Sequence, residues 1–157
     1  MKKIHFLTLF LSTFLIFSCG FKVENFSKLT NFSISNVETV GDQRINYKIK
    51  NSLLLKTKQS SGPLINVNLI TKKTKSIKEK NIKNEVTKYN LNIIVNVSFN
   101  KLGESKEDSF SVSKSSEYVV ANRHSTTRDN ENKSLEILSE KISQEIFEKL
   151  ITQVDDL

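Results

Sequence analysis

The chain has 157 residues, with 24 lysines and arginines against 17 acidic residues, and a formal net charge of +7 at pH 7. It contains one proline and four glycines, which argues against a linker-rich or repeat architecture, and its length suits one domain with one core. The basic balance does not indicate a nucleic-acid partner, because no stacking aromatic residues are interleaved with the lysines.

The first eighteen residues have the organisation of a secretory signal peptide. Lys2 and Lys3 form a charged start, and a mainly apolar segment runs from Ile4 to Phe17. This segment is shorter than the roughly 20 apolar residues of a spanning helix. We therefore predict a signal peptide over residues 1–18, with an uncleaved N-terminal anchor as the alternative.

The signal peptide is followed by Cys19, the only cysteine in the chain. An apolar segment that ends in a small residue before cysteine is typical of bacterial lipoproteins. Lipidation through a thioether would consume a thiol that has no disulfide partner in an oxidising compartment. We predict that Cys19 carries a covalent diacylglycerol and an N-acyl lipid, and we expect no other cofactor. Residues 19–28 are then a lipidated tether, and residues 29–157 form a single domain.

Hydrophobic periodicity predicts a strand, a helix and a second strand in the first half of this domain. Residues 32–37 alternate partly and suit a short strand. Asp42 is a suitable N-cap for a helix, because its carboxylate can accept a hydrogen bond from the first turn. Residues 65–70 alternate again and predict a strand. The apolar stripe of the intervening helix contains Ile45, Ile49, Leu53 and Leu54.

The clearest alternation in the chain lies in its second half. Residues 72–83 are strongly basic and are predicted to form a long hairpin loop or frayed strand ends. Every odd position of residues 89–99 is apolar, and asparagine and serine occupy most of the even positions. Such a pattern predicts a strand with one buried face and one wet face. A turn at residues 100–103 then leads into a fourth strand within 110–119.

The last element is predicted to be an amphipathic helix, preceded by a polar loop over residues 123–130 and capped by Asp129 or Asn130. Both predicted helices are amphipathic, and the strands have one apolar face. We therefore predict an α+β fold of the order β-α-β-β-β-α. It is a two-layer sandwich in which two helices pack on one face of a four-stranded, mostly antiparallel sheet. The apolar stripe of the last helix contains Leu135, Leu138, Ile142, Ile146, Leu150 and Val154.

The sequence offers little for catalysis. It contains no cysteine–histidine cluster for a metal, no glycine-rich phosphate loop and no Gly-x-Ser-x-Gly motif. His124 is the only histidine after the signal peptide. A small hydrolase would have to combine it with a serine and an acid such as Glu117 or Asp129. We therefore expect that the protein is not an enzyme.

The basic segment is the sharpest chemical feature that remains. One interpretation is an anion-binding strip, and the other is a solvated loop in a lysine-rich protein. Among the anions that an envelope lipoprotein meets, the phosphorylated head groups of lipopolysaccharide (LPS) are the natural candidate. The polar strand faces likewise fit either water or a polar, protein-lined cavity. The residues that we single out as candidate LPS ligands are Lys72, Lys73, Lys75 and Lys78.

Several segments together resemble the LPS-assembly lipoprotein family (LptE). They are the start at Cys19-Gly20-Phe21, the Tyr89-x-Leu91 strand, and a C-terminal signature. The signature consists of the strand residues Ser116-Glu117-Tyr118 and the helix segment Leu138-Ser139-Glu140-Lys141-Ile142-Ser143-Gln144-Glu145-Ile146 through Leu150. The order and spacing of the elements over nearly the whole chain after the signal peptide is also similar to that family.

The resemblance implies a lipoprotein on the periplasmic side of the outer membrane, attached by its lipids. Such a protein would sit in the lumen of a large outer-membrane β-barrel (LptD-like), plug it, assist its assembly and contact LPS during export. Gly20 after the lipidated cysteine is consistent with release to the outer membrane. The alternative is an auxiliary or scaffold lipoprotein of another envelope transport complex, such as an accessory of an ABC transporter, without LPS contact.

Overall fold

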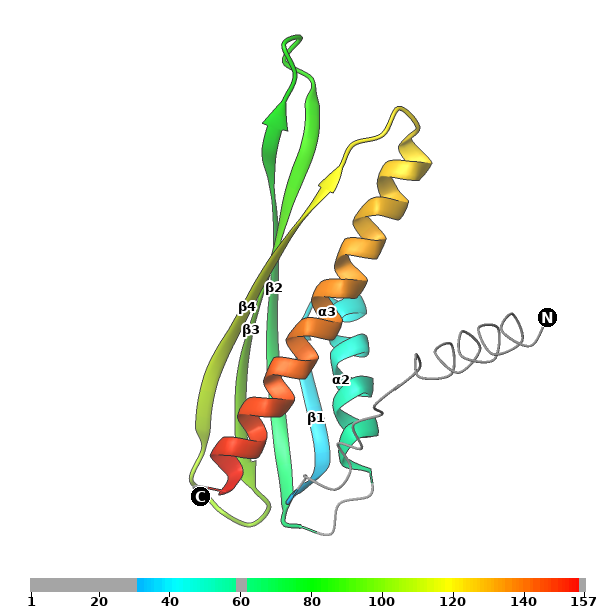
Figure 1. Ribbon diagram of the computed structural model, residues 1–157. Coiled ribbons are helices and arrows are strands. Elements are labelled where there is room, and N and C mark those ends of the chain that lie inside the picture. Colours follow the sequence, from blue (N-terminus) through cyan, green and yellow to red (C-terminus); the bar gives the residue numbers. More distant parts are fainter. Residues whose placement is uncertain (1–30, 59–61, 156–157) are drawn as a thin grey trace, which may run out of the picture.

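The computed structural model describes residues 31–58 and 62–155, and these form a four-stranded sheet with two helices (Figure 1). The predicted α+β fold and its order β-α-β-β-β-α are confirmed. The predicted signal peptide, tether and lipidated Cys19 lie outside the described residues. The elements are β1 (Ser33–Gly41), α2 (Gln43–Thr57), β2 (Leu64–Lys80), β3 (Val86–Lys101), β4 (Asp108–Val119) and α3 (His124–Asp155).

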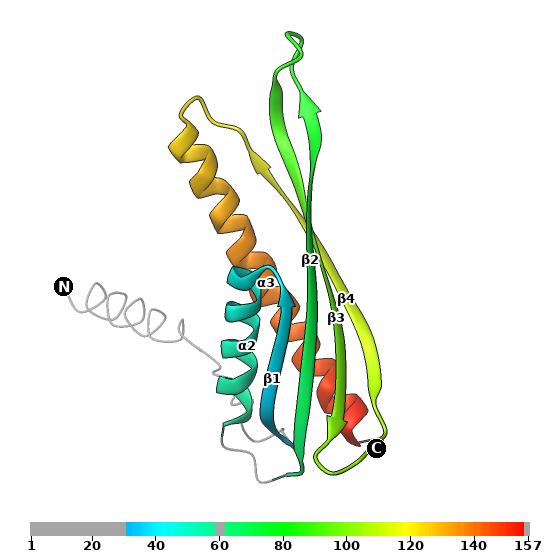
Figure 2. The ribbon, with the colours of Figure 1, turned by 180° about the vertical axis from the view of Figure 1, so that it is seen from behind.

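The four strands follow one another across the sheet in the order β1-β2-β3-β4. β1 pairs with β2 in parallel, whereas β2–β3 and β3–β4 are antiparallel. A parallel pair needs a crossover connection, and α2 supplies it. Both helices lie on the same face of the sheet, as the two views show (Figures 1 and 2).

The core lies between this face and the helices. Residues 91–99 of β3 show the predicted alternation, because every odd position is almost completely buried. On α2, Ile45, Ile49 and Leu53 are buried against the sheet. The predicted stripe of α3 is buried along its whole length. It consists of Leu135, Leu138, Ile142, Ile146, Leu150 and Val154.

The two helices run parallel to each other and are joined by polar contacts at successive turns. Arg44 donates a hydrogen bond to the Asn132 side chain at 2.7 Å. One turn later, Lys48 pairs with Glu136 at 2.8 Å. The Ser143 hydroxyl then donates to Ser52 at 3.0 Å. These contacts fix the register of α3 along α2, while the apolar stripes of the two helices contact the sheet.

The corner between β1 and α2 explains where β1 stops. Gly41 has a φ of +107°, and a Cβ at this position would lie 2.0 Å from the Thr71 carbonyl oxygen of β2. Asp42 follows as the predicted N-cap, and its carboxylate accepts a hydrogen bond from the Ile45 N–H at 3.1 Å. The buried Thr71 hydroxyl donates to Asn46 at 2.6 Å, which fastens the first turn of α2 to β2.

Two of the predicted boundaries are wrong. The basic segment at 72–83 is not mainly a loop, because β2 stays paired with β3 in regular register as far as Ile77 and, after register shifts, as far as Lys80. α3 also begins at His124, so neither Asp129 nor Asn130 is its N-cap, and most of the loop predicted over 123–130 is helical. Both segments project past the main core and are largely polar, so hydrophobic periodicity gives no sign of their regular structure.

No helix within residues 31–58 and 62–155 combines the length and the apolar character that crossing a bilayer requires.

The corner at Gly41 provides a test of this fold. We expect Gly41→Ala to lower the free energy of unfolding by about 2 kcal/mol or more, because a positive φ costs an L-residue roughly 1–2 kcal/mol and the methyl group would also overlap the Thr71 carbonyl. Gly103→Ala is the matched control, since Gly103 has a φ of +92° but no neighbour within 4 Å of an added Cβ. Denaturant unfolding of both variants measures the difference, and equal losses would contradict the role of the contact with Thr71.

Candidate functional site

The four candidate LPS ligands lie on β2, but the strand divides them between the two faces of the sheet. Successive side chains of a strand point to opposite faces, so Lys73 and Lys75 share the helix-covered face with buried Leu69. Lys72 and Lys78 lie on the opposite side, which we call the open face. The structure therefore does not bring the four lysines together as one strip.

Three of these lysines are engaged in ion pairs with other elements. Lys73 pairs with the Asp42 carboxylate at 2.7 Å. Lys78 pairs with Glu117 of β4 at 3.2 Å across the open face. Lys75 pairs with Glu131 of α3 at 2.9 Å. Within the described ranges, Lys72 is the candidate without an ion pair.

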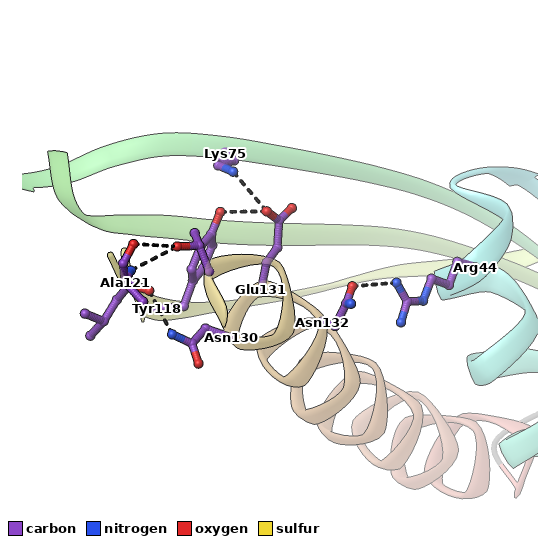
Figure 3. A network of polar contacts seen from close by, with 9 residues as sticks. Arg44, Lys75, Tyr118, Ala121, Asn130, Glu131 and Asn132 are labelled. Carbon is purple, nitrogen blue, oxygen red and sulfur yellow. Dashed lines mark hydrogen bonds and ion pairs between the residues drawn. The ribbon is translucent and has the colours of Figure 1, made fainter. Parts of the chain in front are cut away.

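Lys75 belongs to a cluster that holds the start of α3 against the hairpin of β2 and β3 (Figure 3). The Tyr118 hydroxyl donates to the same Glu131 oxygen, Oε2, at 2.8 Å. The Lys75 ammonium also lies 4.2 Å from the centre of the Tyr89 ring and 5.2 Å from that of Tyr118. The two tyrosine rings are 5.6 Å apart. One cation thus connects two strands and a helix through a carboxylate and two aromatic rings.

The environment of this cluster keeps the pair charged. Partial burial alone would raise the pKa of Glu131, but hydrogen bonds from Lys75 and Tyr118 and the charges of Lys75 and Lys73 outweigh it and lower this pKa. Burial alone would lower the pKa of Lys75, but its contacts with Tyr118 and Glu131 raise it instead. Both groups therefore remain ionised over the physiological range.

Beside the cluster lies a cleft of about 630 Å³ between the hairpin and the first turns of α3, which we call the cationic cleft. Cations outnumber acids in it, since Glu131 is the only acidic residue in its lining. Glu131 is paired with Lys75, and Lys73 is paired with Asp42, so Arg44 and Arg128 are the lining cations that form no ion pair among the described residues. Its charged and titratable lining residues are Arg44, Lys73, Lys75, His124, Arg128 and Glu131.

Sequence reasoning found Lys73 and Lys75 but missed the two arginines of the cationic cleft. Arg44 lies in the first turn of α2, and Arg128 lies in the part of α3 that was predicted to be a loop. Neither stands in a basic run. One hint of Arg44 was present in the sequence: it lies two residues after the N-cap Asp42, at the start of α2. This position points to the cleft only once the parallel pairing of β1 and β2 is known, because that pairing places the start of α2 beside Lys73.

The open face of the sheet has a different character. Asparagine and serine side chains cover most of it, and its charged groups include Glu38, Lys72, Lys78 and Glu117. Val40 and Ile70 add two exposed apolar side chains at the β1 edge. No described element covers this face (Figure 2). Its polar uncharged residues on β2, β3 and β4 include Asn66, Asn68, Asn90, Asn92, Asn96, Ser98, Asn100, Ser109, Ser111, Ser113 and Ser115.

A shallow groove of about 320 Å³ crosses one end of the open face, where β1, β2 and β3 meet. Its lining includes Asn36, Asn66, Asn68 and Asn100. The side-chain oxygen of Asn68 is buried and has no hydrogen-bond partner within the described structure. The groove therefore offers amide groups together with the carboxylates of Glu38 and Glu107 to whatever contacts this end of the sheet.

The residues considered for catalysis do not assemble into a recognisable centre. His124 is exposed at the start of α3 and makes no side-chain hydrogen bond to a serine or an acid among the described residues. In the same part of the chain, no group of three or more histidine, cysteine, aspartate and glutamate side chains is placed to hold a metal ion.

Replacing Glu131 tests the cluster. We expect Glu131→Gln to lower the free energy of unfolding by about 1–2 kcal/mol at pH 7, because two charge-assisted or hydroxyl hydrogen bonds to a partly buried carboxylate are weakened. The depressed pKa means that this stabilisation is present above the unfolded pKa of about 4.3 and is lost as the pH falls through the folded value. The difference from wild type should therefore shrink below pH 4. Glu136→Gln, which breaks the exposed pair with Lys48, is the control and should have a smaller effect. A difference that did not change with pH would contradict the role of the Glu131 charge.

Comparison with known sequences gives no match, because neither a family model nor a curated protein corresponds to the chain. Comparison of the fold does find solved structures. A candidate lipoprotein from Caulobacter crescentus superposes with a TM-score of 0.57 at 13% identity, over 84% of this chain and 96% of that one.

Two further structures have a similar architecture. The rare lipoprotein B from Shewanella oneidensis has a TM-score of 0.50 at 14% identity, over 81% of this chain and 94% of that one. A minor lipoprotein from Acinetobacter baumannii has a TM-score of 0.50 at 15% identity, over 79% and 93%. At these identities the likeness concerns the fold, and the described domain shares its fold with small proteins designated as bacterial lipoproteins.

Proposed function

We propose that the protein is an outer-membrane lipoprotein, attached through lipids on Cys19, that plugs a β-barrel LPS translocon and assists its assembly. It acts by binding and carries out no catalytic step. The resemblance of its sequence segments to the LPS-assembly lipoproteins supports this proposal, and so does a fold found among small lipoproteins. The observation that carries it furthest is the composition of the open face.

The open face suits the inside of a polar cavity better than an apolar interface or a strongly charged ligand. Large outer-membrane barrels have polar interiors. Amides and hydroxyls can exchange hydrogen bonds with water for hydrogen bonds with a barrel wall, whereas buried charges incur a large desolvation penalty. Ser111 and Ser113 of β4 and Asn92 and Asn96 of β3 place such groups near the middle of this face. A plug can therefore contact the wall here without burying many charges.

We also propose that the protein contacts LPS, and that it does so in the cationic cleft. Arginine binds phosphate through paired hydrogen bonds. Arg44 and Arg128 line the cleft, while Lys73 is already held by Asp42 and Lys75 by Glu131. We therefore assign the principal LPS contacts to these cleft residues and a smaller part to Lys72 and Lys78, which lie on the open face.

The plug proposal predicts that a charge on the open face disrupts the complex. Asn96 is exposed on the central strand β3. We expect Asn96→Arg to abolish or strongly reduce co-purification with a large outer-membrane barrel in mild detergent, because the added cation must be desolvated against the wall. Its unfolding midpoint should stay close to that of wild type, since exposed substitutions usually change stability by no more than about 0.5 kcal/mol.

Thr152→Arg is the matched control, because Thr152 is an exposed neutral residue in the helical layer. This variant should co-purify with the barrel like wild type. Recovery of the wild-type protein alone would contradict the plug proposal. Recovery with an ABC transporter would favour the accessory lipoprotein instead.

The cleft proposal predicts a loss of LPS binding when its arginines are neutralised. We expect the double variant Arg44→Gln/Arg128→Gln to bind LPS at least about tenfold more weakly, because a hydrogen bond to a charged group contributes roughly 1.5–3 kcal/mol and 1.4 kcal/mol corresponds to a factor of ten. Lys106→Gln/Lys141→Gln removes the same charge from exposed positions elsewhere. Equal losses in the two double variants, measured by titration at constant salt, would show that total charge and not the cleft controls binding.

A further inference from the structure

The hairpin of β2 and β3 projects beyond the rest of the sheet. β1 ends where Gly41 pairs with Thr71, and β4 ends where Val119 pairs with Lys88. The end of the hairpin therefore extends past both neighbouring strands (Figure 1). It lies at the opposite end of β2 from Leu64, which pairs with the first residue of β1.

The turn at the end of this hairpin, residues 81–85, is held by hydrogen bonds of its own. The Asn81 N–H donates to the Glu85 carbonyl at 2.9 Å, and the Asn84 N–H donates to the Asn81 carbonyl at 2.9 Å. The Asn81 side-chain oxygen accepts from the Lys83 and Glu85 N–H groups at 2.9 and 3.0 Å. Asn84 adopts a φ of +63°, a conformation that asparagine tolerates well. The turn thus presents its outward side chain in a defined position.

That side chain is apolar. Ile82 is fully exposed, with a relative accessibility of 103%, and Ile77 lower on the hairpin is 53% exposed. A fully exposed isoleucine at a hydrogen-bonded turn has no role in the core, which lies more than ten residues away along β2. The Ile82 side chain can therefore contact a surface outside the domain.

Cations surround Ile82. Lys80 and Lys83 are exposed and form no ion pair in the part of the chain that the structure describes, although Lys80 donates to the Asn84 side chain at 2.8 Å. The acidic residues nearby are engaged: Glu79 pairs with Lys88 at 2.6 Å, and Glu85 accepts from the Asn81 amide at 2.7 Å. Glu85 keeps its negative charge, because the Asn81 amide is neutral, so Lys80 and Lys83 leave the hairpin tip (residues 79–88) with a small excess of positive charge beside one projecting apolar side chain.

We propose that this tip docks on the surface of an anionic phospholipid bilayer. Ile82 enters the boundary between head groups and acyl chains, and Lys80 and Lys83 contact lipid phosphates. Apolar residues that penetrate this boundary beside lysines are the elements of interfacial membrane binding. Phospholipids suit the tip better than LPS, because a bulky saccharide head group would keep one isoleucine away from the acyl chains. The site goes beyond the proposed plug function and does not depend on it.

The absence of tryptophan from the chain allows a direct test. Ile82→Trp places a single fluorescent reporter at the tip of the full chain. The purified protein, inserted into neutral phosphatidylcholine vesicles, is titrated with a second population that contains phosphatidylglycerol. We expect a blue shift of the emission, and quenching when the acyl chains of the second population are brominated. A second population of pure phosphatidylcholine should produce neither change.

Tyr47→Trp is the matched control, because Tyr47 is 68% exposed on α2 and away from the hairpin. Its emission should not respond to either population. Equal responses from the two reporters, or no response at Ile82→Trp, would overturn the proposal. A response to LPS aggregates but not to phosphatidylglycerol would overturn the assignment to phospholipid.

The lysines are tested in the same background. Adding Lys80→Gln and Lys83→Gln to Ile82→Trp should raise the lipid concentration needed for the response at least tenfold. Added salt should also raise the lipid concentration that the Ile82→Trp variant needs. Lys106→Gln/Lys141→Gln in the Ile82→Trp background should leave the titration unchanged. A tip response that is insensitive to both the lysines and salt would contradict the electrostatic part of the site.

Discussion

The register between β2 and β3 decides the character of both faces of this molecule. Pairing runs without interruption from Ile65 opposite Lys101 to Ile77 opposite Tyr89. Because side chains alternate with a period of two, a slip by one residue would expose the apolar side chains of β3 and bury its asparagines. The two helices bury the apolar side chains of β2 and β3 on one face of the sheet. The same register therefore determines which amides and hydroxyls lie on the open face. The candidate interaction surface is a direct consequence of the way the core is packed.

The cationic cleft depends on the same register and on the long final helix. Lys73 and Lys75 reach the cleft only because they continue the buried face of β2 beyond Thr71. The first turns of α3 extend past the core and bring Arg128 and Glu131 beside them. Glu131 forms an ion pair with Lys75, which fixes one wall of the cleft. Because Glu131 is the one acidic residue in the lining, the cleft keeps an excess of positive charge. A shorter helix would bury the same core but would leave no cleft.

The parts of the fold that touch the core could be predicted from the sequence. The alternation of residues 89–99 and the stripe from Leu135 to Val154 follow directly from burial, and Asp42 was recognisable as an N-cap. The basic half of β2 and the first two turns of α3 could not be predicted, since their regular structure comes from pairing with β3 and from contacts such as that of Glu131 with Tyr118. The cleft could not be predicted for the same reason, because Arg44 and Arg128 are distant in sequence and meet only in the folded chain.

The early end of β1 at Gly41 has a consequence for self-association. Beyond Thr71, one edge of β2 has no neighbouring strand among the described elements, and unpaired backbone of this kind invites pairing with a second copy. In such a dimer, lysines from one copy would meet lysines from the other along residues 72–80. Their mutual repulsion opposes strand addition between identical molecules. The lysine content of this edge therefore disfavours edge-to-edge pairing of two copies of the sheet.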